Sequence, residues 1–263
     1  RHRGRWARGR GRGVTAAPVL VLRPQPGADE TVRALAARGI AALARPVLGI
    51  EPLPETPALR ALVQRLDEFD VVVFVSPAAV RHGMKWMDEH WPQYPARIAW
   101  LAVGERTRRA LAAWDLDALA PADSRTEGLV ELEPLAAPGV ERVLIVRGEG
   151  GREALAETLS ARGLRVEHLV VHARRPLAVA LPAPDEIAAA VATSAEVVDA
   201  FVATGGGAFV ERPLLVPSER VADHARGVGF QRVRIMAGAG AAETLEALAA
   251  LGITGPPGQG GEQ

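Results

Sequence analysis

The segment RGEGGRE, residues 147–153, combines residue types that suit an anion. Its three glycines let a backbone come close to a ligand, and the N-terminal amides of the helix expected next would face a negative charge. Arg147 and Arg152 could add bidentate contacts to a carboxylate. A flexible turn with a solvated Arg152 explains the spacing equally well. Glu153 stands where the third glycine of G-x-G-x-x-G would be, which argues against a nucleotide-dependent oxidoreductase.

Polar or small residues also follow the apolar runs in both halves of the chain. They are Arg23, Ser76, Gly104, Arg147, Ser194 and Ser218, with Thr107, Gly148 and Thr193 close by. Open α/β sheets bind ligands beyond the carboxyl ends of their strands, so this pattern predicts a ligand site there. Turns need small residues as well, and the pattern therefore locates a site without naming its chemistry.

The other polar groups give fewer predictions. No serine lies in a G-x-S-x-G context and no pair of acids stands out, so nucleophilic and paired-carboxylate catalysis have little support. The six histidines lack metal-ligand spacing. His82 and His90 would share a helix face, where a surface role is favoured. The turn at 238–243 could supply further anion-binding amides, and the glycines at 205–207 are expected to be structural only.

Short apolar runs alternate with helical patterns, and these elements must position the polar residues. The expected strands are 19–22, 71–75, 98–103, 143–146, 188–192 and 214–216. The expected helices include 28–38, 106–114, 152–162, 195–202 and 241–250. Gly39 and Gly163 follow two of these helices as expected C-cap residues. Unbroken apolar strands are typical of sheets covered on both faces, and strand–helix alternation indicates parallel pairing.

An internal repeat indicates a duplicated α/β unit. Three segments of the first half align, in the same order, with three of the second: 19–39 with 143–163, 74–80 with 191–197, and 101–111 with 215–225. The aligned candidate residues are Arg23 with Arg147, Ser76 with Ser194, and Gly104 with Ser218. Two similar lobes with a cleft between them are predicted.

Composition limits the class of protein. Residues 1–12 hold six arginines and no acid, whereas the rest of the chain carries 25 basic and 31 acidic residues, so the folded body is not expected to bind nucleic acid. The absence of cysteine excludes thiol chemistry. No apolar run is long enough to span a membrane, and a cytoplasmic protein is expected. The ends, 1–17 and 253–263, are predicted to be disordered, with an RNA-binding N-terminal arm as the less favoured alternative.

Taken together, several segments resemble the bacterial uroporphyrinogen-III synthase family. The resemblance runs from about residue 19 to residue 250, and its most specific motif is RG-x-GGRE-x-L, which begins at Arg147. The other matching segments are LVLRPQPGADETVRAL, FVSPAAV, AVGERTRRAL, PADSRTEGLVEL, VATSAEV and LLVPSERVADHARGVGF. Each segment alone is weakly specific, and the resemblance rests on all of them occurring in the same order as in the family.

The resemblance implies a fold of two α/β domains with parallel sheets, joined by a two-stranded linker. In that fold the first domain is discontinuous. Carried over to this sequence, the first domain is 18–39 plus 177–252, the second is 50–163, and the linker strands are 40–49 and 164–176.

The resemblance also implies a cofactor-free and metal-free lyase of haem biosynthesis, acting as a monomer without nucleic-acid or membrane partners. Such an enzyme cyclises hydroxymethylbilane with loss of water and inversion of the last pyrrole ring. The substrate carries many carboxylate arms, which arginines, hydroxyls and helix N-terminal amides can bind. The alternative is a non-catalytic two-domain binding protein for an anionic small molecule.

This sequence departs from the family pattern at two positions. The family usually has a tyrosine in a Y-x-R context at the end of the return linker strand, where this chain has His172 followed by Arg174. His172 is therefore a candidate hydrogen-bond donor, with a titration expected near pH 6–7. The alternative is a linker residue turned away from the site. Ala78 stands where asparagine is common.

Overall fold

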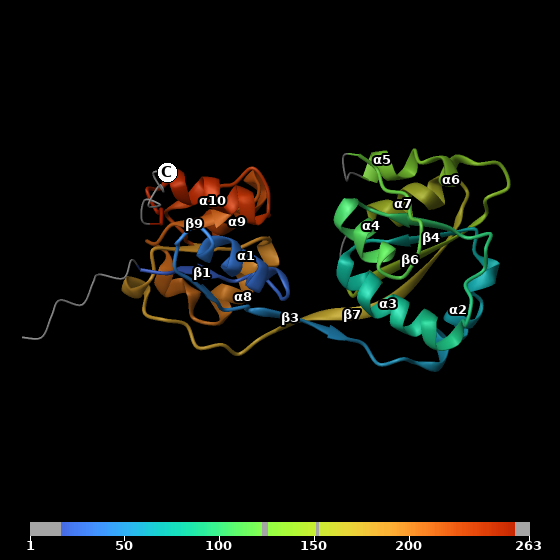
Figure 1. The fold of residues 1–263 in the computed structure, drawn as a ribbon, viewed down its shortest axis with the longest axis horizontal. Helices are drawn as coiled ribbons and strands as arrows, with labels where there is room; N and C mark the ends of the chain where they lie inside the picture. The colour runs from blue at the N-terminus through green and yellow to red at the C-terminus, as the bar shows by residue number, and fades with distance from the viewer. Residues whose placement is uncertain (1–16, 123–125, 151–152, 256–263) are drawn as a thin grey trace, which may run out of the picture. The chain divides into compact units, whose positions relative to one another are not determined.

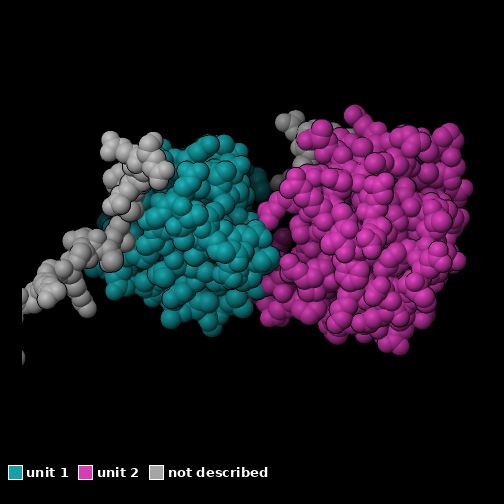
Figure 2. Space-filling view, in the orientation of Figure 1, with its two compact units in different colours: residues 1–49, 176–263 teal, residues 50–175 magenta. Residues whose placement is uncertain are grey.

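The computed structural model describes residues 17–122, 126–150 and 153–255 (Figure 1). The disorder predicted for the two ends falls almost entirely outside these ranges, as does Arg152. The chain divides into two compact units, residues 1–49 with 176–263 and residues 50–175 (Figure 2). In the described ranges, none of the helices is both long and apolar enough to cross a lipid bilayer.

The first unit contains a parallel sheet of five strands in the order β10-β9-β8-β1-β2. The strands are β1 (Val19–Val21), β2 (Ala42–Ala44), β8 (Ala189–Val191), β9 (Leu214–Val216) and β10 (Val233–Ile235). The helices are α1 (Gly27–Ala36), α8 (Ala195–Ala203), α9 (Glu219–Gly227) and α10 (Ala241–Ala250), with short 3-10 turns at Pro184–Glu186 and Gly206–Phe209. Leu20 packs into the core under α8 and α9, whereas Val19 and Val21 pack under α1 and α10, as strand alternation requires.

The second unit contains a sheet in the order β3-β7-β6-β4-β5, in which β4 to β7 pair in parallel. The strands are β3 (Leu48–Pro52), β4 (Val71–Phe74), β5 (Ala99–Ala102), β6 (Arg142–Gly148) and β7 (Arg165–Pro176). The helices are α2 (Pro57–Gln64), α3 (Pro77–His90), α4 (Glu105–Ala112), α5 (Thr126–Val130), α6 (Glu133–Ala136) and α7 (Ala154–Ala161), with a 3-10 turn at Leu66–Glu68. Leu144 and Val146 pack on the α3 side of the sheet, and Val143 and Ile145 on the α7 side.

The two sheets share an order of strands. The repeat aligns β1 with β6, β8 with β4 and β9 with β5, so the order β9-β8-β1-β2 corresponds to β5-β4-β6-β7. Each unit therefore combines strands from both halves of the sequence. The predicted α/β class with parallel sheets is confirmed. Gly39 and Gly163, which we expected as C-cap residues, adopt positive φ values of 71° and 88° in the turns after α1 and α7. The C-cap residues themselves are Ala37 and Arg162.

The connecting segments differ from the expected pair of linker strands. Residues 40–49 contain β2, an edge strand of the first sheet, and only the first residues of β3. The chain passes to the second unit within β3 and returns at the end of β7, and these two strands are neighbours. Much of β7 pairs with β6, so residues 164–176 form a sheet strand as well as a connection. The sequence VRI of β10 is too short and too polar to have been predicted as a strand.

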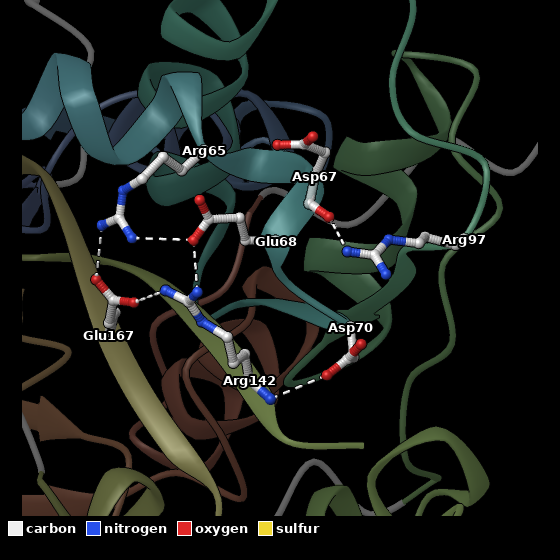
Figure 3. A network of polar contacts seen from close by, with 7 residues as sticks. All are labelled: Arg65, Asp67, Glu68, Asp70, Arg97, Arg142 and Glu167. Atoms are coloured by element: carbon white, nitrogen blue, oxygen red, sulfur yellow. Dashed lines mark hydrogen bonds and ion pairs between the residues drawn. The ribbon is translucent and has the colours of Figure 1, made fainter. Parts of the chain in front are cut away.

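A network of ion pairs joins segments near the amino end of β6 (Figure 3). Arg142, the first residue of β6, donates to Glu68 at 2.5 Å and to Glu167 at 2.6 Å. Arg65 bridges the same two carboxylates at 3.2 and 3.1 Å. Asp70, directly before β4, accepts a hydrogen bond from the backbone amide of Arg142 at 3.0 Å. These contacts tie β4, β6 and β7 together at the end where β4 and β6 begin.

Replacing Arg142 with methionine should lower the free energy of unfolding of the second unit by about 1 kcal/mol, because two carboxylates lose a shared cation in a network. Methionine keeps an apolar stem near the Phe69 ring, over which the Arg142 guanidinium lies at 5.1 Å. Urea unfolding followed by tryptophan fluorescence would measure this, since four of the five tryptophans lie in residues 50–175.

The matched control is Arg109→Met, which breaks an ion pair with Glu105 in the same unit. The Arg109 side chain is 75% exposed, compared with 23% for Arg142, so its loss should change the midpoint less. Equal shifts for the two variants would contradict a structural role of the network.

Candidate functional site

The candidate residues of the second unit gather at the carboxyl edge of its sheet. Ser76 follows β4, Gly104 follows β5, and Arg147 and Gly148 end β6. His172 lies on β7 directly opposite Gly148. Because β4 to β7 are parallel neighbours, these residues come together at one edge.

The candidate residues of the first unit gather in the same way. Arg23 follows β1, Thr193 and Ser194 follow β8, and Ser218 follows β9. These strands are also parallel neighbours, so the residues meet at the carboxyl edge of the first sheet. The structure thus places the predicted residues in two sets, one on each sheet.

The aligned serines Ser76 and Ser194 are N-caps with nearly identical backbone angles. Ser76 Oγ accepts the amide of Ala79 at 3.1 Å at the start of α3, and Ser194 Oγ accepts the amide of Val197 at 3.3 Å at the start of α8. Their hydroxyls are therefore partly used by the fold. Ser218 has the same extended backbone at the start of α9, but its side chain makes no capping bond.

Gly104 and Thr107 belong to the first turn of α4. Gly104 is the N-cap residue and is buried, and its carbonyl accepts the amide of Thr107 at 3.0 Å. Thr107 is itself buried. Thr193 is half-buried directly before the Ser194 cap. Backbone amides at the start of α4 thus lie at this edge, and such amides favour a negative charge.

Arg147 is buried and is held by its own loop. Its Nη1 donates to both carboxylate oxygens of Glu153, at 2.9 and 3.0 Å. Its Nη2 donates to the carbonyl of Gly150, and its Nε to that of Gly148 at 3.3 Å. We expected Arg147 to offer its guanidinium to a ligand. In the structure this guanidinium binds Gly148, Gly150 and Glu153 of its own chain segment instead.

Arg23 is also engaged within its unit. Its Nη1 donates to the carbonyl of Ala239 at 2.7 Å, which lies in the turn before α10. The guanidinium packs on Gly27, where an added Cβ would come within 2.6 Å of Nε. In the same turn, the Glu243 carboxylate folds back over Gly240, where an added Cβ would collide with its Oε2. A protein carboxylate therefore already lies at this glycine turn, which we had expected to offer its amides to a ligand.

A register shift sets the direction of His172. Arg147 pairs with Val170, but the next residue, Gly148, pairs with His172, so β7 has one extra residue at this point. Before the shift, Leu169 packs on the α3 side of the sheet, and strict alternation would turn His172 to the opposite side. Because of the extra residue, two consecutive residues face α3: Val171 packs in the core on that side, and the His172 ring pairs with His82 of α3.

The His172 ring lies against Gly148 and is 3% exposed. A Cβ at position 148 would come within 2.5 Å of Nε2, so a larger residue there would displace the ring. Burial, followed by the nearby His82, Arg174 and Arg81, lowers the pKa of His172 to about 4. The expected titration near pH 6–7 is therefore wrong, because the apolar sheet edge and its cations disfavour the charged ring.

His82 is the residue that the sequence did not identify. It lies on α3, and its ring centre is 5.7 Å from that of His172. We expected a surface role, but His82 is half-buried, and burial lowers its pKa, with smaller contributions from Arg81 and Lys85. A sequence signal was available in the neighbouring Gly83, since a glycine inside a helix often marks a close approach. Within the described ranges, no three His, Asp or Glu side chains gather as metal ligands would.

Comparisons with known proteins agree on one family. Residues 29–246 match the family described as uroporphyrinogen-III synthase HemD. The uroporphyrinogen-III synthase of Escherichia coli (strain K12) is 30% identical over 233 residues, which cover 82% of this chain and 94% of the relative. A mutant uroporphyrinogen III synthase from the extremely thermophilic bacterium Thermus thermophilus aligns with a TM-score of 0.58 at 19% identity, covering 90% of this chain and 99% of that one. The Helicobacter pylori uroporphyrinogen-III synthetase aligns with a TM-score of 0.54 at 15% identity, covering 89% and 99%.

The low pKa of His172 should make the second unit less stable in mild acid. Between the ordinary value of 6.5 and about 4, only the unfolded chain binds a proton at this ring. The free energy of unfolding should therefore fall as the pH drops through this window, by up to about 3 kcal/mol. His172→Phe removes this contribution and should flatten the fall.

Urea unfolding followed by tryptophan fluorescence at pH 7, 5.5 and 4.5 would test this effect. His82 and His168, whose pKa values are also lowered, should leave a residual slope in the His172→Phe variant. Identical slopes for the variant and the parent chain would mean that His172 titrates normally in the folded protein.

Proposed function

This chain belongs to the uroporphyrinogen-III synthase family, and we propose on that basis that it converts hydroxymethylbilane into uroporphyrinogen III. The observation that carries this function is the family match over residues 29–246, which include every candidate residue except Arg23. In this reaction water leaves, the last pyrrole ring is inverted and the macrocycle closes. A non-catalytic binding protein is not favoured, since the E. coli relative that matches 82% of this chain is a synthase.

The candidate residues suit a polyanionic substrate. We propose that carboxylate arms bind helix N-terminal amides at the carboxyl edges of the sheets. The second unit offers such amides at the starts of α3 and α4, and the first unit offers them at the starts of α8 and α9. Ser218, whose hydroxyl does not cap its helix, is the serine best able to donate to a ligand. Arg147 then acts indirectly, because its guanidinium is already bonded to Glu153 and to the Gly150 carbonyl. A substrate contact of Arg152 stays a prediction.

We propose that His172 is a neutral hydrogen-bond donor in this reaction. With a pKa of about 4 the ring carries no charge near pH 7, so one ring nitrogen donates and the other accepts. Its place beside Gly148, at the edge where the candidate residues meet, is consistent with contact to the substrate. The leaving hydroxyl and the charge that develops on the pyrrole chain are the groups such a donor would stabilise.

In this proposal the enzyme acts mainly by orienting the last pyrrole ring. The linear substrate can close unaided to the wrong isomer, so a bond-making nucleophile is not required. Holding the last ring for inversion and stabilising charge then account for catalysis. The monomeric state, the lack of a nucleic-acid partner and the cytoplasmic location stay predictions.

Incubating the purified chain with hydroxymethylbilane should give mainly the III isomer. Oxidising the products to uroporphyrins and separating the isomers by chromatography would measure this. A parallel incubation without protein should give the I isomer by unaided closure. If both incubations give the same isomer ratio, the proposed function is wrong.

His172→Tyr should keep the rate of isomer-III formation, because tyrosine is also a neutral donor and is the usual residue in the family. His172→Phe cannot donate and should lose roughly ten- to a thousandfold in kcat if the donor stabilises developing charge. Both the parent chain and His172→Tyr should show no inflection from this position between pH 5.5 and 8.5, since the histidine pKa is about 4. Equal rates for His, Tyr and Phe would exclude a role as donor.

A further inference from the structure

Two imidazoles face the same small region of the second unit. The rings of His82 on α3 and His172 on β7 lie 5.7 Å apart between centres, at 36° to each other. His82 Nε2 and His172 Nδ1 are both buried, and neither has a hydrogen-bond partner among the residues that the structure describes. A direct bond between the rings is not formed in this geometry.

The fold brings the two rings together through two close contacts. Gly83 lies against the sheet, where an added Cβ would come within 2.6 Å of Val146 Cγ1, so α3 packs closely enough for the adjacent His82 to reach β7. On the sheet side, the register shift opposite Gly148 turns His172 toward α3. Two independent features of the backbone therefore produce one pair.

The charges around the pair keep both rings neutral. Arg81 and Lys85 on α3 and Arg174 on β7 lower the pKa of one ring or both, and burial acts in the same direction with larger effect. Among the described residues, no carboxylate contributes to the pKa shift of either ring. A neutral imidazole offers one N–H donor and one acceptor nitrogen.

Two neutral imidazoles at this distance are suited to bind a hydroxyl group. A hydroxyl can donate to one ring and accept from the other, whereas a carboxylate needs two donors and a metal ion needs two acceptors with further ligands. Buried polar nitrogens in native proteins are nearly always satisfied, often by a bound water. Both a water molecule and the hydroxymethyl group of the substrate have this chemistry.

We propose that His82 and His172 form one binding site for a single hydroxyl group, and that His82 is the positioning residue that determines which nitrogen of His172 carries its proton. The kinetic part of this proposal rests on the proposed function, but the tautomer of His172 does not. Since the identity of the donating nitrogen decides where His172 can direct its N–H, a wrong tautomer would turn the donor away from the substrate.

The first test is the tautomer of His172, measured by 15N NMR of the full chain with labelled histidine at pH 7.5. The parent chain should show one dominant tautomer. His82→Leu, which can neither donate nor accept, should give a mixture or the opposite tautomer, and His82→Gln should restore the parent state. His90→Leu is the matched control on the same helix and should leave His172 unchanged. Tryptophan fluorescence verifies that each variant is folded. If His82→Leu does not fold, His82→Gln keeps the test decisive.

The second test is the rate of isomer-III formation. His82→Leu should lower kcat by roughly tenfold with little change in KM, and His82→Gln should recover most of this loss, because a positioning residue acts on the reacting geometry. An unchanged His172 tautomer in every His82 variant would overturn the proposal, whatever the rates are. If the parent chain makes no III isomer, the proposed function is wrong, but the NMR measurement still tests whether His82 determines the tautomer of His172.

Substrate analogues distinguish the two sources of the hydroxyl. A bilane with a methyl group in place of the hydroxymethyl group should bind without disturbing the His172 nitrogen shifts if the hydroxyl belongs to a water. If the substrate supplies the hydroxyl, only a bilane with a hydroxyl at that end should perturb them, and His82→Leu should weaken its binding but not that of the methyl analogue.

Discussion

Parallel strand pairing is the constraint on which the rest of this structure depends. Parallel neighbours cannot be joined by a tight turn, so helices cross over both faces of each sheet. Neighbouring strands then end at the same edge, and the next helix usually begins there. Polar residues that lie far apart along the chain, such as Ser76 and Arg147, are gathered at one edge for this reason alone. The duplicated order of strands produces the same arrangement in both units.

The second sheet uses arginine differently at its two ends. Near the amino end of β6, Arg142 is partly exposed and shares two carboxylates with Arg65, which joins segments distant in sequence. At the carboxyl end, Arg147 is buried and bonds within its own loop. A buried guanidinium must be satisfied by fixed partners, so Arg147 has little freedom to follow a ligand. Its bonds go to Gly148, Gly150 and Glu153.

Periodicity and the internal repeat were enough to predict the fold class, because unbroken apolar strands and strand–helix alternation have few other solutions. They were not enough to predict the histidine pair. Strand alternation predicts the side of the sheet that each residue of β7 faces only if the strand is regular. One extra residue opposite Gly148 changes the side that His172 faces, and nothing in the composition of β7 indicates it. Gly83 and Gly148 are the only local signs of the contact, and a glycine alone does not name its neighbour. The short strand β10 escaped prediction, and β2 was expected as part of a linker strand rather than as an edge of the first sheet, because tertiary pairing, not local pattern, defines such strands.

The environment of His172 bears on how histidine could replace the tyrosine that the family resemblance implies at this position. A phenol is a neutral hydrogen-bond donor near pH 7 because its pKa is about 10. An exposed imidazole would be partly charged there, but burial and the nearby cations lower the pKa of His172 to about 4. Both side chains thus present one neutral donor at the same sheet edge. The imidazole differs in having a second nitrogen, which can accept a hydrogen bond. The His82 ring lies 5.7 Å away between ring centres, and a hydroxyl shared with His82 is the partner that we propose for this nitrogen.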